Sequence, residues 1–317
     1  MAIQRALNPG SGSGMRLKVG NCPDSWGVWF GEPDPLQTPW ERCYDEIKEA
    51  GYKYVESGPW GYAPTDAQVM KAAMEARGFS VTGTNMMVHY EDVEARDQIR
   101  SVARQISDYL AKLDAEYFIF IDGSYTGGTH TDPTGREVEM PERLDDAAFD
   151  ALIEFTVDLA RMISADYGLR PVFHPHADTH VQYEDQIERY LEATDHADVG
   201  LLLDTGHHAY AGGDPVAFMR KWGHRVDYLH LKNVEPTIAA KVQAENIPMT
   251  EATKMGVWVE PGDGVVDFDD FLNAIVEADF SGYAVVEQDM YPVPFDKPLP
   301  IAKRTLAWLE EHGYTSA

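Results

Sequence analysis

Short apolar runs alternate with longer amphipathic stretches from Met15 to the end of the chain. Eight runs of six or seven residues are rich in β-branched, aromatic and leucine side chains, as strands are, at 16–21, 52–57, 79–85, 117–122, 170–175, 199–204, 226–232 and 283–288. Most of them are continuously apolar rather than alternating, which is typical of parallel strands buried on both faces. The pattern therefore predicts a parallel sheet of eight strands.

The stretches between these strands repeat apolar residues at intervals of three and four, as amphipathic helices do. The first opens with a Thr–Pro cap and closes on Gly51, and the second, of the same design, closes on Gly78. Strand and helix alternate strictly through eight units, so we expect a single (β/α)8 TIM barrel. A doubly wound sheet is the alternative, but residues 20–34 lack the glycine-rich phosphate loop that usually follows its first strand.

One catalytic domain is expected over residues 15–317, preceded at 1–14 by a flexible leader or a remnant of cloning. Two inserts, at 123–141 and 234–264, follow the fourth and seventh strands. Both lie on the C-terminal side of the strands, where a barrel has its active site. They are candidates for rims, lids or oligomer contacts.

The composition removes several classes of function. Apolar residues make up 44% of the 317 residues, enough for a full core, and the formal net charge is −27. So acidic a surface repels phosphate backbones and anionic lipid, so neither nucleic acid nor a membrane surface is expected as a partner. Cys22 and Cys43 form no CxxC pair, and no apolar run approaches the ~20 residues of a membrane span. We therefore expect a cytoplasmic protein without a disulfide framework.

The last four predicted strands each end in a side chain that can bind a metal ion. These are His174, Asp204, His230 and Glu287. Taken singly, such a histidine is often a hydrogen-bonded structural residue, and such an aspartate often caps a turn or helix. Because the carboxyl ends of all barrel strands converge on one mouth, we instead expect the four to share one divalent ion. Imidazole with carboxylate suits Mn²⁺ or Co²⁺, with Zn²⁺, Fe²⁺ or Mg²⁺ as alternatives.

Further polar and aromatic residues are predicted at the same mouth. The candidates for acid or base are Glu287, His176, His207, Lys232 and Glu56; those for substrate binding are Trp26, Trp29, Trp60, Tyr62, Asn85 and Asp122. Aromatic walls with polar tips suit a polyol or keto-sugar, whose CH faces stack and whose hydroxyls need partners. Loop packing is the alternative for the aromatics.

The segments "LDTGHHAYAGGDP", "YLHLKN", "PGDGVVDF" and "VVEQDMYP" resemble the sugar phosphate isomerase/epimerase superfamily, the xylose isomerase-like barrels. The opening from "NCPDSWGVWF" to "ESGPWGYAPTD" is similar to the inosose dehydratase-like branch, which serves myo-inositol catabolism. The resemblance covers nearly all of the chain after Met15. It also implies that such barrels often pair, so a homo-oligomer is expected.

The resemblance implies a ligand set and shows one departure from it. In the epimerases, a divalent ion is held by Glu, Asp, His and Glu from strands five to eight, and Asp204, His230 and Glu287 match the last three. Strand five reads "FHPH" where "LEPH" is usual, so His174 stands in place of a glutamate that also serves as acid or base. This departure favours a lyase over an epimerase.

The expected reaction is metal-dependent dehydration of a keto-cyclitol such as 2-keto-myo-inositol through an enediolate. The metal acidifies the hydrogen beside the ketone; Glu287 or His176 removes it, and His207, Lys232 or Glu56 protonates the departing hydroxyl. A metal-dependent sugar isomerase or epimerase is the first alternative, and β-elimination of a 3-keto glycoside the second. The intact metal ligands argue against a sugar-binding scaffold, and the acidic charge argues against an endonuclease.

Overall fold

Parallel strands form the inner wall of the molecule. The computed structural model describes residues 17–126, 129–131 and 137–314, so the leader predicted at 1–14 lies outside the described residues. Strand segments pair in the order β3-β2-β1-β13-β10-β9-β8-β5-β4, and every pair in this sheet is parallel. Their bounds are β1 (Leu17–Asn21), β2 (Tyr54–Val55), β3 (Ser80–Val81), β4 (Gly83–Val88), β5 (Tyr117–Asp122), β8 (Arg170–Phe173), β9 (Gly200–Asp204), β10 (Val226–Leu231) and β13 (Gly282–Val286).

The two ends of this sheet meet at one residue. Segments β3 and β4 are separated only by Thr82, so both belong to the third predicted strand. The Thr82 amide donates to the carbonyl of Val55 on β2, at 2.9 Å, and the Thr82 carbonyl accepts from the amide of Tyr117 on β5, at 3.0 Å. The sheet thereby closes into a parallel barrel, which confirms the predicted fold and excludes the doubly wound sheet.

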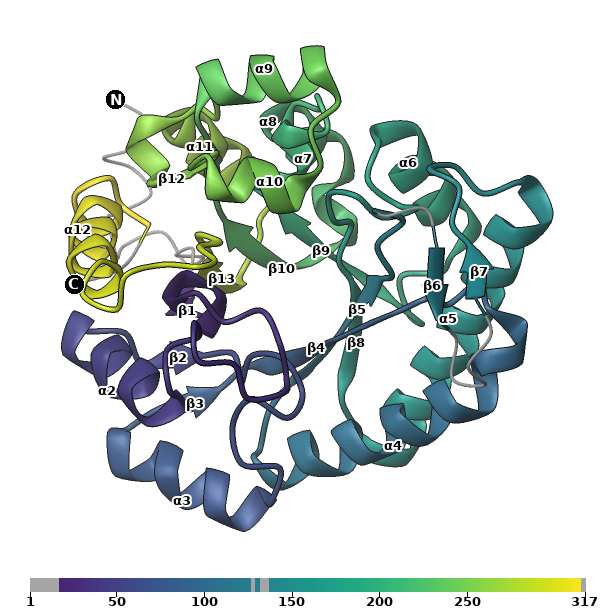
Figure 1. Cartoon of the computed structure of the whole chain (residues 1–317), viewed down its shortest axis with the longest axis horizontal. Helices are drawn as coiled ribbons and strands as arrows, with labels where there is room; N and C mark the ends of the chain where they lie inside the picture. Colours follow the sequence, from purple (N-terminus) through teal and green to yellow (C-terminus); the bar gives the residue numbers. More distant parts are fainter. Residues whose placement is uncertain (1–16, 127–128, 132–136, 315–317) are drawn as a thin grey trace.

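Helices surround the barrel as an outer ring (Figure 1). Their bounds are α2 (Trp40–Ala50), α3 (Ala67–Arg77), α4 (Arg96–Lys112), α5 (Asp146–Tyr167), α6 (Glu184–Ala193), α8 (Pro215–Trp222), α11 (Phe268–Glu277) and α12 (Pro298–Glu311). Gly51 and Gly78 end α2 and α3 at positive φ, as predicted. The Thr–Pro cap is wrong: Pro39 takes the cap position of α2, and the Thr38 hydroxyl donates instead to the carbonyl of Trp26.

Both predicted inserts contain secondary structure. The first carries β6 (Thr129–Thr131) and β7 (Glu137–Glu139), which form an antiparallel pair. The second carries α9 (Pro236–Glu245), α10 (Met249–Lys254) and β12 (Trp258–Val259); β12 pairs with β11 (Asn233–Val234). A short helix that periodicity did not predict, α7 (Thr205–Tyr210), follows β9 directly.

Continuous apolar strands arise because each strand is buried on both faces. On β5, Phe118 and Phe120 belong to the core between sheet and helices, whereas Ile119 and Ile121 belong to the core inside the barrel. Inside, the rings of Tyr54, Tyr117, Tyr228 and Tyr283 contact one another. They fill the interior beneath the polar strand ends, so the hollow part of the barrel lies at its mouth.

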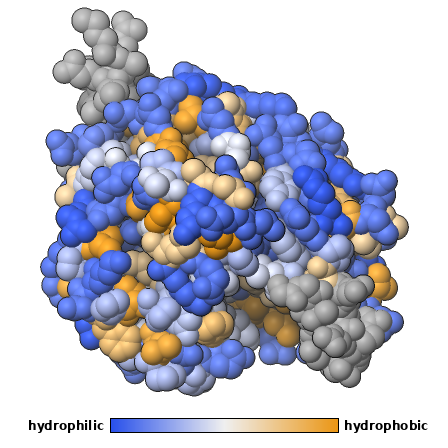
Figure 2. All heavy atoms as spheres, turned by 45° about the horizontal axis from the view of Figure 1, so that its top comes forward, coloured by the Kyte–Doolittle hydropathy of each residue, from blue (hydrophilic) through white to orange (hydrophobic). Residues whose placement is uncertain are grey.

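Hydrophilic side chains predominate on the face that Figure 2 shows, and its apolar side chains lie in small groups, as the net charge of −27 leads one to expect. Cys22 and Cys43 are both buried and free, which agrees with the absence of a disulfide framework. Within the described part of the chain, no helix is long and apolar enough to cross a membrane.

Candidate metal centre and pocket

Asp204 ends β9, and its two carboxylate oxygens have different surroundings. Its Oδ1 caps α7 by accepting from the amides of Gly206, at 2.7 Å, and His207, at 2.8 Å. Its Oδ2 is buried and lies 3.2 Å from Nζ of Lys232, but it has no hydrogen-bond partner among the described residues. One oxygen of this carboxylate therefore caps the helix, and the cap orients the other oxygen, which could bind a metal ion.

His230 on β10 lies between three carboxylates. Its Nε2 lies 2.7 Å from Oε1 of Glu56, which also accepts from the hydroxyl of Tyr228. Its Nδ1 lies 2.8 Å from Oε2 of Glu287 and 3.4 Å from Oδ2 of Asp204. Glu56 thus holds one ring nitrogen and turns the other toward the carboxylates, as residues behind a metal ligand commonly do.

His174, directly after β8, is the least tethered member of the cluster. Its side chain is 1% exposed, yet neither ring nitrogen has a hydrogen-bond partner in the described residues. Its Nε2 lies 3.9 Å from Oδ2 of Asp204. A buried polar atom without a partner is costly, so His174 and Asp204 present atoms that a cation would satisfy, and Nδ1 of His230 faces the same carboxylates.

The four predicted metal residues are therefore close neighbours, and His207 is a further candidate ligand beside them. One ligand atom each from His174, Asp204, His207 and Glu287 lies within 4.8 Å of the others; His230 forms a second such group with Glu56 and Glu287. Nitrogen and carboxylate donors in this arrangement fit a divalent transition-metal ion. Buried clusters of histidine and carboxylate that could bind a metal are thus present where the sequence places them.

Lys232 supplies the positive charge of the cluster. Its fully buried ammonium donates to Oε1 of Glu287 and Oδ2 of Asp289, both at 2.6 Å, and lies 2.8 Å from Nε2 of His207. Burial would lower the pKa of this ammonium, but the surrounding carboxylates, Asp204 first, outweigh burial and raise it. Lys232 is therefore a charged anchor for these carboxylates.

The carboxylates respond to their surroundings in opposite directions. Burial alone would raise the pKa of Asp204, but Lys232 and His230 outweigh it and lower the pKa to about 2. The pKa of Glu287 also falls, because His230 and Lys232 outweigh its burial. Burial raises the pKa of Asp289 to about 7, with Glu287 adding to the effect. Burial, with His230, lowers the pKa of His174, which favours the neutral ring that a metal needs.

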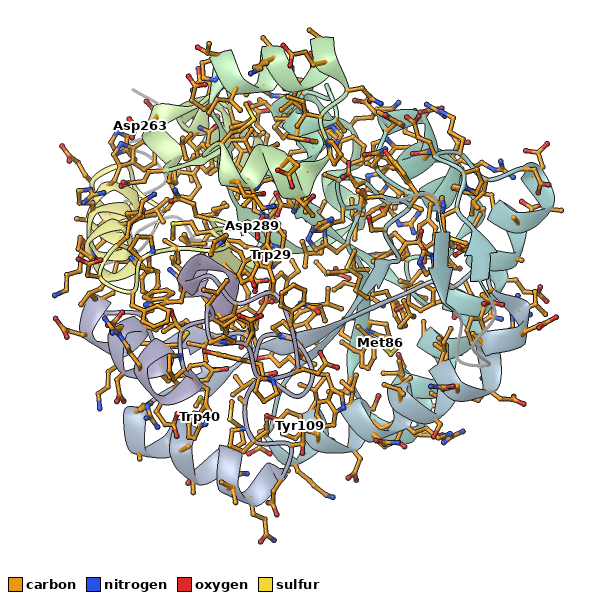
Figure 3. The ribbon with its side chains drawn as sticks, in the orientation of Figure 1. Trp29, Trp40, Met86, Tyr109, Asp263 and Asp289 are labelled. Carbon is orange, nitrogen blue, oxygen red and sulfur yellow. The ribbon has the colours of Figure 1, made fainter. Side chains whose placement is uncertain are left out.

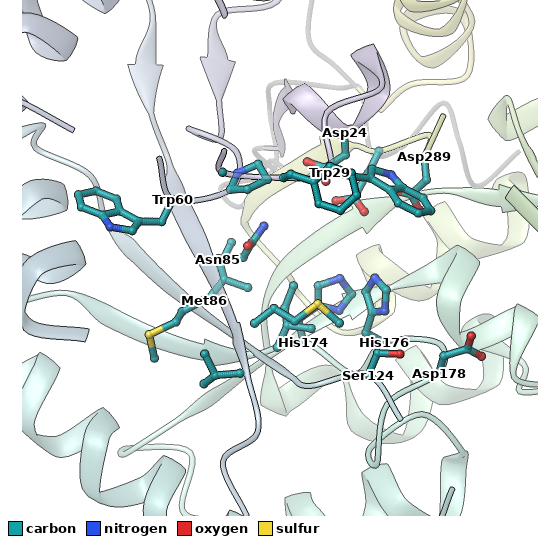
Figure 4. A pocket seen from close by; sticks show the side chains of 18 of the residues that line it. Asp24, Trp29, Trp60, Asn85, Met86, Ser124, His174, His176, Asp178 and Asp289 are labelled. Atoms are coloured by element: carbon teal, nitrogen blue, oxygen red, sulfur yellow. The ribbon is translucent and has the colours of Figure 1, made fainter. Parts of the chain in front are cut away.

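A cavity of about 560 Å³ opens in front of this cluster. Asp24, Asp289 and Trp29 lie on one side of it, and His174 and His176 lie on the facing side (Figure 4). Trp29 and Asp289 lie near the centre of the barrel mouth (Figure 3). The rest of the wall is mostly apolar: Trp60, Met86, Met87, Val88, Val102, Ile106, Ile119 and Ile121. This volume is in the usual range for small-molecule sites.

The structure separates the predicted pocket residues into two sets. Those that line the cavity are Trp29, Trp60, Asn85, His174, His176, His230 and Glu287. Those that do not are Trp26, Tyr62, Asp122, Glu56, His207, Lys232 and Asp204. Trp26 is fully buried and donates to Glu46, and the Tyr62 hydroxyl donates to the carbonyl of Thr38. Both of these aromatics pack in loops, the alternative noted above.

Sequence reasoning missed four acidic residues of the cavity, Asp24, Glu32, Asp178 and Asp289, of which Asp24 and Asp289 lie on the side that faces His176. Asp24 lies in the 3-10 helix Pro23–Trp26 after β1, and its Oδ2 is buried without a partner among the described residues. Asp289 stands two residues beyond Glu287, as Lys232 stands two beyond His230. That spacing could have revealed Asp289, but nothing in the sequence distinguishes Asp24 from an aspartate that caps a turn.

Two inosose dehydratases are among the proteins to which the chain is similar over most of its length. The chain is 30% identical over 289 residues to an inosose dehydratase of Geobacillus thermodenitrificans, covering 90% of this chain and 94% of the relative. It is 29% identical over 253 residues to an inosose dehydratase of Geobacillus kaustophilus, covering 80% of each.

Solved structures share the fold at much lower identity. The IOLI protein with a bound zinc atom superposes with a TM-score of 0.71 at 16% identity, covering 95% of this chain and 100% of that one. A probable 3-DHS dehydratase from Bacillus anthracis has a TM-score of 0.65 at 13% identity, covering 93% and 99%. The model of the xylose isomerase-like TIM barrel family matches residues 44–312. The chain therefore belongs to the xylose isomerase-like TIM barrel family.

Proposed function

We propose that this protein is a metal-dependent lyase that dehydrates a keto-cyclitol of the inosose type. The observation that carries the proposal is the buried group of histidines and carboxylates beside a cavity of about 560 Å³, in which the ring nitrogens of His174 and Oδ2 of Asp204 have no hydrogen-bond partner among the described residues. The inosose dehydratases among the relatives support the substrate class. The histidine-rich fifth strand supports a lyase.

His174, Asp204, His230 and Glu287 would hold the ion, with His207 as the alternative to one of the histidines. When bound, a divalent ion supplies Lewis acidity, which makes the hydrogen beside a ketone easier to remove. Mn²⁺ or Co²⁺ is our first choice. Glu56 and Lys232 would hold His230 and Glu287 in place from behind, since neither lines the cavity.

His176 is the best-placed base. Its Nδ1 lies 2.8 Å from the carbonyl of Ala177, and because a carbonyl only accepts, Nδ1 carries the hydrogen. Nε2 therefore keeps a lone pair, on a ring that lines the cavity. Glu287 remains the second candidate for base.

The group that protonates the departing hydroxyl would lie across the cavity from His176. Asp24 and Asp289 occupy that side (Figure 4). Lys232 and His207 do not line the cavity. Lys232 donates a hydrogen bond to Asp289 and lies beside His207, so both would act through Asp289. We therefore add Asp24 and Asp289 to the acids proposed from the sequence. Glu56, which does not line the cavity, would hold His230 in place instead.

Two other outcomes share the first half of this reaction. Ionisable groups on opposite walls would also serve a sugar isomerase or epimerase, which returns a proton to the carbon it came from or to its neighbour. The apolar wall of β4, β5 and α4 would accommodate the aglycone of a 3-keto glycoside that undergoes β-elimination.

The test is incubation of the full chain with Mn²⁺ or Co²⁺ and a panel of inososes, keto-sugars and 3-keto glycosides, with mass detection. Dehydration removes one water from an inosose. A product of unchanged mass that carries solvent deuterium identifies an isomerase or epimerase, and release of an aglycone identifies β-elimination. If all three products are absent with every metal tested, the proposed function is wrong.

A further inference from the structure

A second group of histidines and carboxylates lies at the barrel mouth and shares no residue with the first. His89, Glu91, Asp122 and His180 each offer a ligand atom, and these atoms all lie within 4.8 Å of one another. They come from the loop after β4, the end of β5 and the loop between β8 and α6. The sequence predicted only Asp122 among them, as a substrate-binding residue, and it does not line the cavity.

Individual distances in this group suit a common ion. Nδ1 of His180 lies 2.8 Å from Oδ2 of Asp122 and 3.7 Å from Oε1 of Glu91, and Nδ1 of His89 lies 3.0 Å from that same Glu91 oxygen. Donor atoms around a tetrahedral ion with bonds of about 2.0–2.1 Å are separated by roughly 3.3 Å. Small side-chain shifts would therefore bring these atoms to bonding distance.

The negative charges of Glu91 and Asp122 have too few positive partners nearby. The side chains of Glu91 and Asp122 are 7% and 0% exposed, and each has one oxygen, Oε2 and Oδ1, without a hydrogen-bond partner among the described residues. Their ion-pair partners in the described part of the chain are His89 and His180, with no lysine or arginine. Two buried carboxylates of this kind call for a cation.

Two features of the surroundings orient the histidines toward the carboxylates. Nε2 of His180 lies 3.0 Å from the carbonyl of Pro141, so it carries the hydrogen and leaves Nδ1 facing Asp122. Gly123 makes room for His89, because a Cβ at position 123 would come within 2.4 Å of the His89 ring. Both contacts hold a histidine ring in place beside the carboxylates, as binding of a metal ion requires.

We propose that His89, Glu91, Asp122 and His180 form a second site for a divalent transition-metal ion, whose task is to position the loop between β8 and α6. That loop carries His176, and it is joined to the end of β5 by a bridge between Ser124 and Thr179. The ion would therefore position the cavity wall without contacting substrate. This site is independent of the proposed function.

Zinc stoichiometry tests the proposal. The full chain is stripped with a chelator, reloaded with excess Zn²⁺ and desalted, and bound zinc is counted by elemental analysis and native mass spectrometry. We expect two zinc ions per chain in the unaltered protein. His180→Gln and His89→Gln should each bind one, and a matched change in the partly buried His196–Asp227 pair, His196→Gln, should still bind two.

The two proposals fail in different ways. If Asp204→Asn keeps one ion that His89→Gln then removes, the second site is established; if only the Asp204 change removes zinc, it is refuted. Zinc content unchanged in both His89→Gln and Glu91→Gln would show a hydrogen-bonded network without an ion. His89 is 13% exposed and His180 is fully buried, so His89→Gln carries the test should His180→Gln fail to fold by circular dichroism.

Discussion

The two halves of the barrel mouth present different side chains to the same cavity. The strands β8, β10 and β13 bring His174, His230 and Glu287, whereas β4 and β5 bring mainly apolar residues such as Met86 and Ile119. Buried charges need one another, because an isolated charge in a low-dielectric interior is very costly. The ionisable residues of the cavity are therefore gathered on one side, and the other side is a mostly apolar wall.

Among substitutions on the side of the cavity that carries the ionisable residues, Asp204→Asn should cause the largest loss of activity. Asparagine can still cap α7 through its oxygen, but it removes the carboxylate charge that would hold the ion. We expect loss of the ion at this centre, but not of one at the second site, and a fall in turnover of about 10⁴-fold, equal to about 5 kcal/mol.

The control is Asp214→Asn, since Asp214 caps α8 in the same way at an exposed position. Metal content by elemental analysis and turnover of the active keto-cyclitol are measured together. An Asp204→Asn protein with the metal content and turnover of the unaltered protein would refute the metal centre.

Lys232→Met should have the largest effect on stability. It leaves the buried carboxylates of Glu287 and Asp289 without their shared ammonium. Breaking a buried pair of this kind typically costs about 3–5 kcal/mol of unfolding free energy. Denaturant unfolding of the metal-free protein measures this cost.

Lys254→Met is the matched change, because Lys254 forms an exposed pair with Glu251. It should alter the unfolding free energy by less than about 0.5 kcal/mol. Equal effects of the two substitutions would mean that Lys232 is not the anchor of the cluster.

His176→Gln should lower kcat by about 10²–10³-fold, as expected on loss of a positioned base. The change leaves Asp204 and the other proposed ligands in place, so the protein should keep its metal. Solvent-deuterium exchange into the substrate should fall in parallel with kcat. Unimpaired exchange would move the role of base to Glu287.

Trp29→Leu should have the smallest effect and should separate binding from chemistry. Trp29 lines the cavity and stacks on Tyr291, with ring centroids 5.4 Å apart. Loss of an aromatic face is worth about 0.5–1.5 kcal/mol, so KM should rise roughly 2–13-fold with little change in kcat. Trp40→Leu, on the outer helix α2 and away from the cavity, should leave both constants unchanged.

The strand pattern predicted the barrel well, and its errors have local causes. The third strand was predicted at 79–85, whereas the structure has β3 and β4 on either side of Thr82, extending to Val88. The sheet changes partner there, from β2 to β5, which no single-strand pattern can reveal. Helix α7 was missed because six residues are too few to show a helical period.

The residue types at the strand ends predicted a metal cluster, but not which residues face the cavity. The sequence gives no way to tell that Trp29 lines the cavity while Trp26 lies in the core, because both belong to the same short segment. Likewise, Asp122 has the same strand-end position as Asp204, yet it pairs with His180 in a separate cluster.

By itself, the sequence determined the alternation of buried strands and amphipathic helices, and with it a barrel whose last four strands end in His174, Asp204, His230 and Glu287. Periodicity suffices for this because burial on two faces constrains every residue of a strand. Only the tertiary structure decided the partners: the cap that turns one Asp204 oxygen inward, Lys232 between carboxylates, and the grouping of His89, Glu91 and His180 with Asp122. These contacts join residues far apart in the chain, and their geometry depends on how the loops fold over the strand ends.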